Sequence, residues 1–148
     1  MITVVEEPGE LCVGTLCQLF HEHGKEVVGP GFNLNMCTFV EAVRFKTIRF
    51  FVARNEQADA VGYACFNIYK DTMRAQDTIA DCQAIYVKPE YRGIVSIKLI
   101  KLAERVLKAD GIRRIYMHVP AATPKVAEMF MKPKMGYKLL EVTMEKEL

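Results

Sequence analysis

The chain has 148 residues, of which 51% are hydrophobic and 26% are charged, and its net charge is +2. This composition is typical of a globular domain with its own core, so we expect a single domain over residues 1–148. The positive charge is too mild to indicate nucleic-acid binding, and no run of about 18 apolar residues predicts a membrane span. The N-terminus has neither a basic region nor a long apolar stretch, which favours a cytoplasmic protein.

The N-terminal segment predicts a strand followed by a helix. Residues 2–6 are rich in β-branched side chains, and Pro8 stands where a first helical turn tolerates proline. Apolar residues then recur at helical spacing, so we expect a helix from about Pro8 to His23, capped by Gly24. His21 and His23 would lie at its solvated C-terminal end, where the helix dipole favours a cationic imidazole.

A long loop and a short helix follow. Residues 24–35 contain three glycines and a proline, and residues 37–45 predict the helix. A loop of this length with its own apolar residues is usually functional or disordered, and Phe32 favours an ordered loop. Phe32 and Phe39 are as consistent with core residues as with residues of a functional loop.

Three strand-like runs come next, over residues 48–53, 60–69 and 79–87. The polar connection at 54–59 is typical of a hairpin, and short connections favour a meander of antiparallel neighbours. Gly62 within the second run predicts a bulge or a close approach of two backbones.

The third run opens a strand–helix–strand unit. Residues 81–87 predict the strand, residues 96–109 a helix that Gly111 ends, and residues 114–119 the next strand. Such a crossover makes the two strands parallel. The first N–H groups of the helix are unpaired and carry the positive end of its dipole. The loop before the helix is therefore a candidate anion site.

The C-terminal part predicts one more helix and further strand. Thr123 and Pro124 are typical of an N-cap and a first helical residue, so we expect a helix to about Lys132. Residues 138–146 then predict a last strand or pair of strands. Together with the central runs, this pattern indicates an α+β fold.

Five cysteines are spread along the chain without a CxxC pair or a closely spaced Cys/His set. Separated cysteines of odd number are typical of free thiols in a reducing compartment, and the pattern predicts no metal site. Cys82 has the best position for a catalytic thiol, although a strand cysteine more often serves packing. The five are Cys12, Cys17, Cys37, Cys65 and Cys82.

One segment resembles the cofactor motif of the GCN5-related N-acetyltransferase (GNAT) superfamily: Ile85-Tyr86-Val87-Lys88-Pro89-Glu90-Tyr91-Arg92-Gly93. The resemblance extends over nearly the whole chain, because residues 60–66 are similar to the family's third strand and residues 135–137 to its closing turn. It implies the acyl-CoA N-acyltransferase fold, a mixed and mostly antiparallel sheet of six to seven strands flanked by about four helices. In that fold strands 81–87 and 114–119 splay apart and the cofactor inserts between them.

The resemblance implies that acetyl-CoA is the co-substrate. The strand would pair with the pantetheine arm, and the backbone amides that begin the helix would hold the pyrophosphate. The motif's first glycine is present, but Val95 and Ile97 replace the later ones. These larger side chains predict less space for the pyrophosphate beside the backbone. The cofactor residues assigned in this way are Ile85, Tyr86, Val87, Arg92, Gly93, Ile94, Val95, Ser96, Ile97 and Lys98.

The resemblance makes Asp81 the candidate general base, because it occupies a position that is commonly glutamate. The family's usual acid is a tyrosine, but Met131 stands at that position, after Phe130. His118 is the second catalytic candidate because an imidazole titrates near neutrality, although a strand histidine is more often structural. Four tyrosines are alternative acids: Tyr86, Tyr91, Tyr116 and Tyr137.

Two functions remain open from the sequence. The first is an acetyl-CoA-dependent N-acetyltransferase that moves the acetyl group directly to a primary amine of a small molecule or a protein. The second is a catalytically degenerate relative with a binding or structural role, of the kind that a phage or mobile element encodes. An unrelated nucleotide-binding domain is disfavoured because the chain lacks GxGxxG and GxxxxGK[ST]. Composition predicts no nucleic-acid or membrane partner, and the resemblance allows a homodimer.

Overall fold

The computed structural model describes all 148 residues, which form two compact units, Met1–Met117 and His118–Leu148. The first unit contains one five-stranded sheet in the order β1-β2-β3-β4-β5. Neighbouring strands are antiparallel except β4 and β5, which are parallel as predicted. The strands are β1 (Thr3–Glu7), β2 (Ile48–Arg54), β3 (Ala60–Lys70), β4 (Thr78–Val87) and β5 (Arg114–Met117).

The chain also contains five α-helices, which confirms the predicted α+β class. No helix is both long and apolar enough to cross a lipid bilayer. The helices are α1 (Gly9–Thr15), α2 (Cys17–Val27), α3 (Met36–Arg44), α4 (Ile94–Ala109) and α5 (Pro124–Met131), with 3₁₀ turns η1 (Gly29–Gly31) and η2 (Pro89–Tyr91).

The predicted helix from Pro8 to His23 is two helices, and it extends further than expected. The backbone breaks at the fully buried Leu16, and α2 continues through Gly24 to Val27. Gly24 does not cap the helix. Its α-carbon lies against the ring of Phe32, so an added Cβ would come within 2.2 Å of that ring. The glycine therefore serves close packing.

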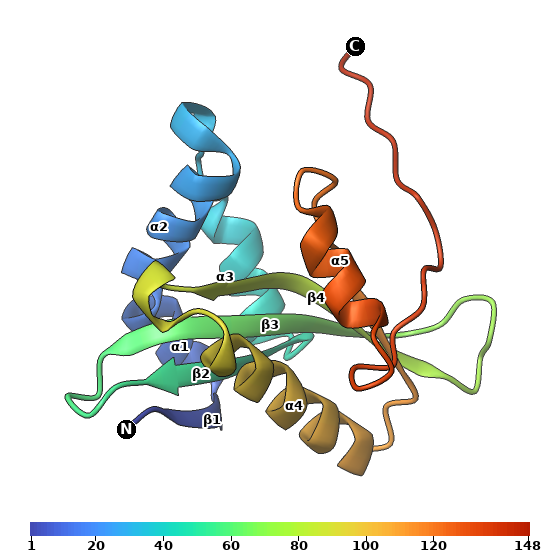
Figure 1. Cartoon of the computed structure of the whole chain (residues 1–148), viewed down its shortest axis with the longest axis horizontal. Coiled ribbons are helices and arrows are strands. Elements are labelled where there is room, and N and C mark those ends of the chain that lie inside the picture. Colours follow the sequence, from blue (N-terminus) through green and yellow to red (C-terminus); the bar gives the residue numbers. More distant parts are fainter. The chain divides into compact units, whose positions relative to one another are not determined.

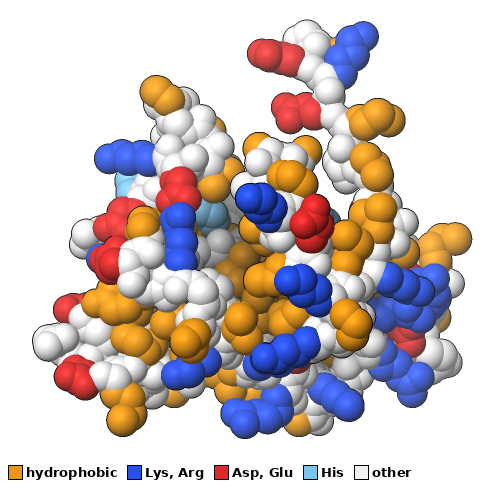
Figure 2. Space-filling view, in the orientation of Figure 1, with side chains coloured by type: hydrophobic (Ala, Val, Ile, Leu, Met, Phe, Trp, Pro, Cys, Tyr) orange, Lys and Arg blue, Asp and Glu red, His pale blue; other side chains and the backbone are white.

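Helices cover both faces of the sheet, with α4 on one face and α1, α2 and α3 on the other (Figure 1). On its outer side α4 is basic, and Figure 2 shows Lys and Arg side chains gathered over this helix. The basic residues of α4 are Lys98, Lys101, Arg105 and Lys108.

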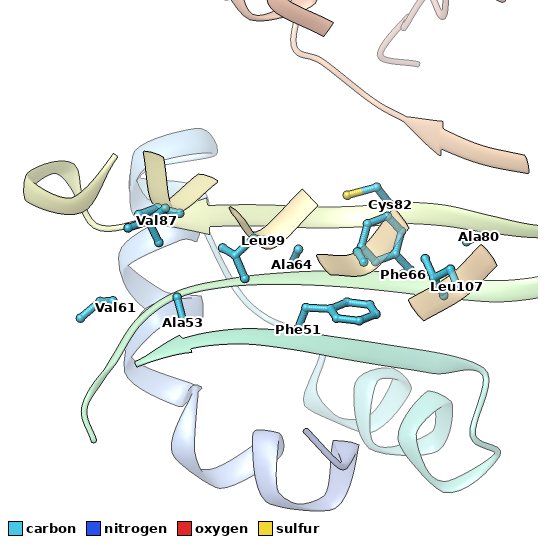
Figure 3. Packing of buried hydrophobic residues seen from close by; sticks show 12 residues of the cluster. Phe51, Ala53, Val61, Ala64, Phe66, Ala80, Cys82, Val87, Leu99 and Leu107 are labelled. Atoms are coloured by element: carbon cyan, nitrogen blue, oxygen red, sulfur yellow. The ribbon is translucent and has the colours of Figure 1, made fainter. Parts of the chain in front are cut away.

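The inner side of α4 packs on the sheet because apolar residues recur every three or four positions along it. In Figure 3, side chains from α4, such as Leu99 and Leu107, lie with Phe51 and Phe66 of the sheet. Strand β2 serves both faces, since Phe51 joins this cluster while Phe50 packs beneath α1–α3. A strand covered on both faces is apolar without alternation.

Gly62 of β3 marks a close approach, as predicted. A Cβ at Gly62 would lie 2.9 Å from Cγ2 of Val87 and 3.0 Å from the carbonyl oxygen of Tyr86. The absence of a side chain thus lets β3 approach the last residues of β4.

The predicted strand count of six to seven is wrong, because residues 138–146 form no strand. Their apolar side chains are exposed, and the second unit contains one helix and no strand with which they could build a ladder. Strand β5 also ends at Met117 instead of residue 119. Pro120 follows closely, and a proline cannot donate to a ladder. That the chain forms one domain stays a prediction.

Candidate active site

The sheet opens where β4 outruns β5. The two strands pair only from Ile79 with Arg114 to Cys82 with Met117. Beyond Cys82, β4 continues to Val87 and pairs only with β3. Residues 83–87 of β4, which we call the free edge, therefore have backbone groups on the β5 side that no strand pairs.

A β-bulge lies at the start of the free edge. Ala84 pairs with Cys65 and Cys82 with Phe66, so Gln83 has no partner in β3. A bulge re-aims the side chains that follow it. Ala80 and Cys82, on either side of Asp81, pack in the cluster under α4, so Asp81 lies on the opposite face of the sheet. After the bulge, Ala84 and Tyr86 pack on that same opposite face, beneath α1–α3.

The free edge leads through η2 into the N-terminus of α4. Gly93 caps this helix at φ 91°, a left-handed conformation that favours glycine, and no atom lies within 4 Å of where its Cβ would be. The first intrahelical bond runs from the Ile97 N–H to the Gly93 carbonyl oxygen. The amides of Ile94, Val95 and Ser96 thus have no carbonyl partner within α4, and they form a site suited to an anion.

The side chain of Val95 does not fill this site, contrary to the narrowing that we expected. It is 7% exposed and belongs to the cluster between α4 and the sheet. Ile97 is half-buried, whereas Ile94 is 73% exposed. Val95, which replaces a glycine of the family motif, is therefore a core residue of the first helical turn.

Arg92 joins the cofactor motif to α2. Its Nε donates to the carbonyl oxygen of Val87 at 2.9 Å, and Nη2 donates to both carboxylate oxygens of Glu26 at 2.8 and 2.6 Å. The guanidinium also lies 5.7 Å from the centre of the Tyr86 ring. Arg92 thus fixes the end of β4 against the helix that precedes the loop at 28–35.

Asp81 lies in a polar row across three strands. It is opposite Asn67 in β3 and Tyr116 in β5. Burial raises the pKa of the Tyr69 phenol, and the neighbouring Asp81 carboxylate, which accepts a hydrogen bond from it, raises that pKa further. The carboxylate therefore has hydroxyl and amide neighbours.

The other catalytic candidates belong to other parts of the chain. His118 is exposed and is the first residue of the second unit, after the end of β5. Met131 ends α5, and the preceding Phe130 contacts Tyr137 with ring centres 5.1 Å apart. Tyr86 is buried and stacks on His23 with ring centres 5.1 Å apart.

The cysteines offer no reactive thiol near the free edge. Cys82 is 4% exposed, and burial, aided by the charge of Asp81, raises the pKa of its thiol to about 12. A thiol of this kind stays protonated at neutral pH and is a poor nucleophile. No group of three or more His, Cys, Asp and Glu side chains could hold a metal ion.

A cavity of about 580 Å³ lies beside the free edge, between α2, α3, the loop that joins these two helices and the sheet. Its lining includes His23 of α2, Tyr63 and Asn67 of β3, and Gln83 at the bulge. None of these four was among the residues assigned from the sequence.

His23 is half-buried in this cavity, so the expected solvated helix end is wrong for it. Its Nδ1 lies 2.7 Å from the Tyr63 hydroxyl. Burial lowers the pKa of His23, Arg92 lowers it further, and Glu26 opposes both. The signal in the sequence was the spacing Leu16, Leu19, Phe20 and His23, which places the imidazole on the apolar stripe of a longer helix.

The sheet opens beside the N-terminus of α4 and a cavity, an arrangement suited to an extended anionic ligand. A sequence profile of the acetyltransferase (GNAT) family matches residues 11–137. The chain therefore belongs to the GNAT family of acetyltransferases. No curated protein matches the chain significantly.

Solved structures agree with this assignment. The chain is similar to a protein of Pyrococcus furiosus assigned as an acetyl transferase, with 26% identity, a TM-score of 0.74 and 100% of both chains covered. It shares its fold with an aminoglycoside acetyltransferase from an uncultured soil metagenomic sample, in complex with sisomicin, at 12% identity and a TM-score of 0.77, covering 99% and 97% of the chains. The ribosomal-protein-alanine N-acetyltransferase of Brucella melitensis has 9% identity and a TM-score of 0.72 over 99% and 100%.

Proposed function

We propose that this protein is an acetyl-CoA-dependent N-acetyltransferase that transfers the acetyl group directly to a primary amine. The observation that carries the proposal is a row of backbone groups that no strand or helix pairs. It consists of the free edge of β4, where the Val87 carbonyl oxygen accepts from the Arg92 side chain, and of the amides of Ile94, Val95 and Ser96 beyond the turn η2. A ligand with a strand-like amide arm and a pyrophosphate matches such a row in both shape and charge.

The residues present fit acetyl-CoA. Ile85 and Val87 belong to the free edge that would pair with the pantetheine amides, and Gly93 leaves the space in which a phosphate can approach the backbone. Lys98 and the other basic residues of α4 add positive charge that attracts a polyanion. When bound, acetyl-CoA supplies a thioester whose acetyl group is activated for transfer.

Asp81 is our proposed base. Its carboxylate accepts a proton from the acceptor ammonium, directly or through a water molecule, and so makes the nitrogen lone pair available. Tyr116, opposite Asp81 in β5, is the nearest of the alternative acids in the strand register. His118 stays a proposed catalytic residue, and its test is whether a His118→Gln variant changes the pH dependence of turnover.

The test is a calorimetric titration of the purified protein with acetyl-CoA and, in parallel, with desulfo-CoA. We expect micromolar dissociation constants for both, because the row of backbone groups does not contact the thiol. Transfer is then measured as release of free CoA in the presence of an amine. No binding at millimolar acetyl-CoA would contradict the proposal and favour a GNAT-fold protein with a binding role.

A further inference from the structure

The cavity beside the free edge has no charged lining. Its residues come from α2, α3, the loop between them and strands β2–β4, and none of them is Asp, Glu, Lys or Arg. His23 is its only imidazole, and burial, which lowers the pKa of that group, favours the neutral form. A cationic group placed deep in this cavity would lose its hydration without gaining a counter-charge.

Aromatic rings build the cavity walls. Phe32 packs directly on the α-carbon of Gly24, and Phe20 contacts Phe39 edge-on with ring centres 5.0 Å apart. The volume of about 580 Å³ suits a small molecule. These walls favour an apolar body held by contact with rings.

One part of the cavity lining adjoins the proposed base. Asn67 and Gln83 line it, and Asp81 is the strand partner of Asn67. Asp81 itself does not line the cavity. A ligand whose apolar part occupies the cavity can therefore place its polar end beside Asn67 and Gln83, next to the carboxylate of Asp81 in the strand register.

We propose that the acceptor is a small molecule with one primary amine on an apolar aryl or alkyl body, the body lying in the cavity and the amine at Asp81. The inference rests on the proposed function and deepens it by naming the substrate class. The inference excludes acceptors that carry several positive charges, because such acceptors need carboxylates that this cavity lacks.

The experiment compares 2-phenylethylamine and hexylamine with spermidine and sisomicin as acceptors at saturating acetyl-CoA. We expect kcat/KM to be at least about tenfold higher for the two monoamines. A factor of about ten is the lower end of the discrimination that differences in pocket contacts give. Equal or higher kcat/KM for the polyamines would overturn the inference. So would a preference for hexanoyl-CoA over acetyl-CoA with the same amine, because the cavity would then hold the acyl chain.

A charge introduced at Thr38 tests the cavity directly. Thr38 lines the cavity and is the third residue of α3, where its N–H donates to the Asn35 side chain. Glu and Gln are both favoured at this helical position, so Thr38→Glu and Thr38→Gln are matched in fold and size. Relative to the Gln variant, the Glu variant should lower kcat/KM for 2-phenylethylamine and raise it for spermidine. Identical ratios in the two variants would overturn the inference.

Failure of the inference is distinguishable from failure of the proposed function. Calorimetry with acetyl-CoA reports on the cofactor alone and involves no acceptor. Binding of acetyl-CoA without acetylation of either monoamine would overturn the substrate class while the cofactor assignment stands. Absence of acetyl-CoA binding would overturn both.

Discussion

Asp81 is the residue on which the proposed chemistry depends most directly. Asp81→Asn keeps the size of the side chain and removes its basicity, so turnover should fall by about two to four orders of magnitude. The affinity for acetyl-CoA should stay the same, because the carboxylate is not part of the free edge. Steady-state kinetics and calorimetry measure the two quantities separately. An unchanged turnover would remove Asp81 from the mechanism.

His23 makes stability depend on pH. Its folded-state pKa is lowered from the ordinary 6.5, mainly by burial, so the unfolded chain binds the proton more readily. The stabilisation is fully present above pH 6.5 and is lost as the pH falls through the lower folded-state pKa. Thermal unfolding between pH 7 and pH 5 should show this loss.

The matched control lies two residues earlier on the same helix. His21 is exposed, so His21→Gln should keep the loss of stability on acidification, whereas His23→Gln should reduce it. Equal pH profiles for His23→Gln and the unsubstituted protein would contradict the half-buried, neutral imidazole.

At the scale of single elements, the N-terminus of α4 should respond to charge. Ile94 is exposed in the first turn of α4. In the Ile94→Glu variant, the added negative charge interacts favourably with the helix dipole and so stabilises the helix, but it repels a pyrophosphate. We expect weaker acetyl-CoA binding, by about fivefold or more, with an unchanged or higher melting temperature. Ile94→Gln is the neutral control. If both variants bind acetyl-CoA alike, the phosphates lie elsewhere.

The elements also show what sequence patterns could predict. The strand, loop and helix of the cofactor motif were predictable, because proline and glycine punctuate it and apolar spacing changes from strand to helix within a few residues. The continuation of α2 past Gly24 could not be predicted. This glycine packs against the ring of Phe32, which comes from another segment, and local sequence does not show such a contact. The cavity and His23 were missed with it.

The bulge at Gln83 escaped prediction for a related reason. It is a property of the register between β3 and β4, and no residue type in the sequence marks it. Residues 138–146 illustrate the converse, because their β-rich composition predicted a strand where the structure supplies no ladder partner. Local pattern indicates what a segment can form, while pairing decides what it does form.

At the scale of the whole first unit, the two core clusters should unfold together. Leu99 of α4 and Leu16 between α1 and α2 are both 0% exposed and lie on opposite faces of the sheet. Either residue replaced by Ala should lower the free energy of unfolding by about 2–5 kcal/mol. Strand β2 contributes to both clusters, so each variant should shift one common transition.

Chemical denaturation followed by far-ultraviolet circular dichroism and by tyrosine fluorescence measures this, since the chain contains no tryptophan. Transitions that separate in either variant would show that the two faces unfold independently.

The free edge of β4 also bears on how the protein behaves without its ligand. Unpaired N–H and C=O groups along a strand are a template on which another chain can add, which is the usual origin of edge-to-edge aggregation. A bound pantetheine arm would occupy the same groups and, at a concentration of about 100 times its dissociation constant, stabilise the fold by about 2.7 kcal/mol. The amide hydrogens of residues 83–87 that point away from β3 should then exchange with solvent more slowly, and the ligand that serves the reaction would also keep the protein monodisperse in storage.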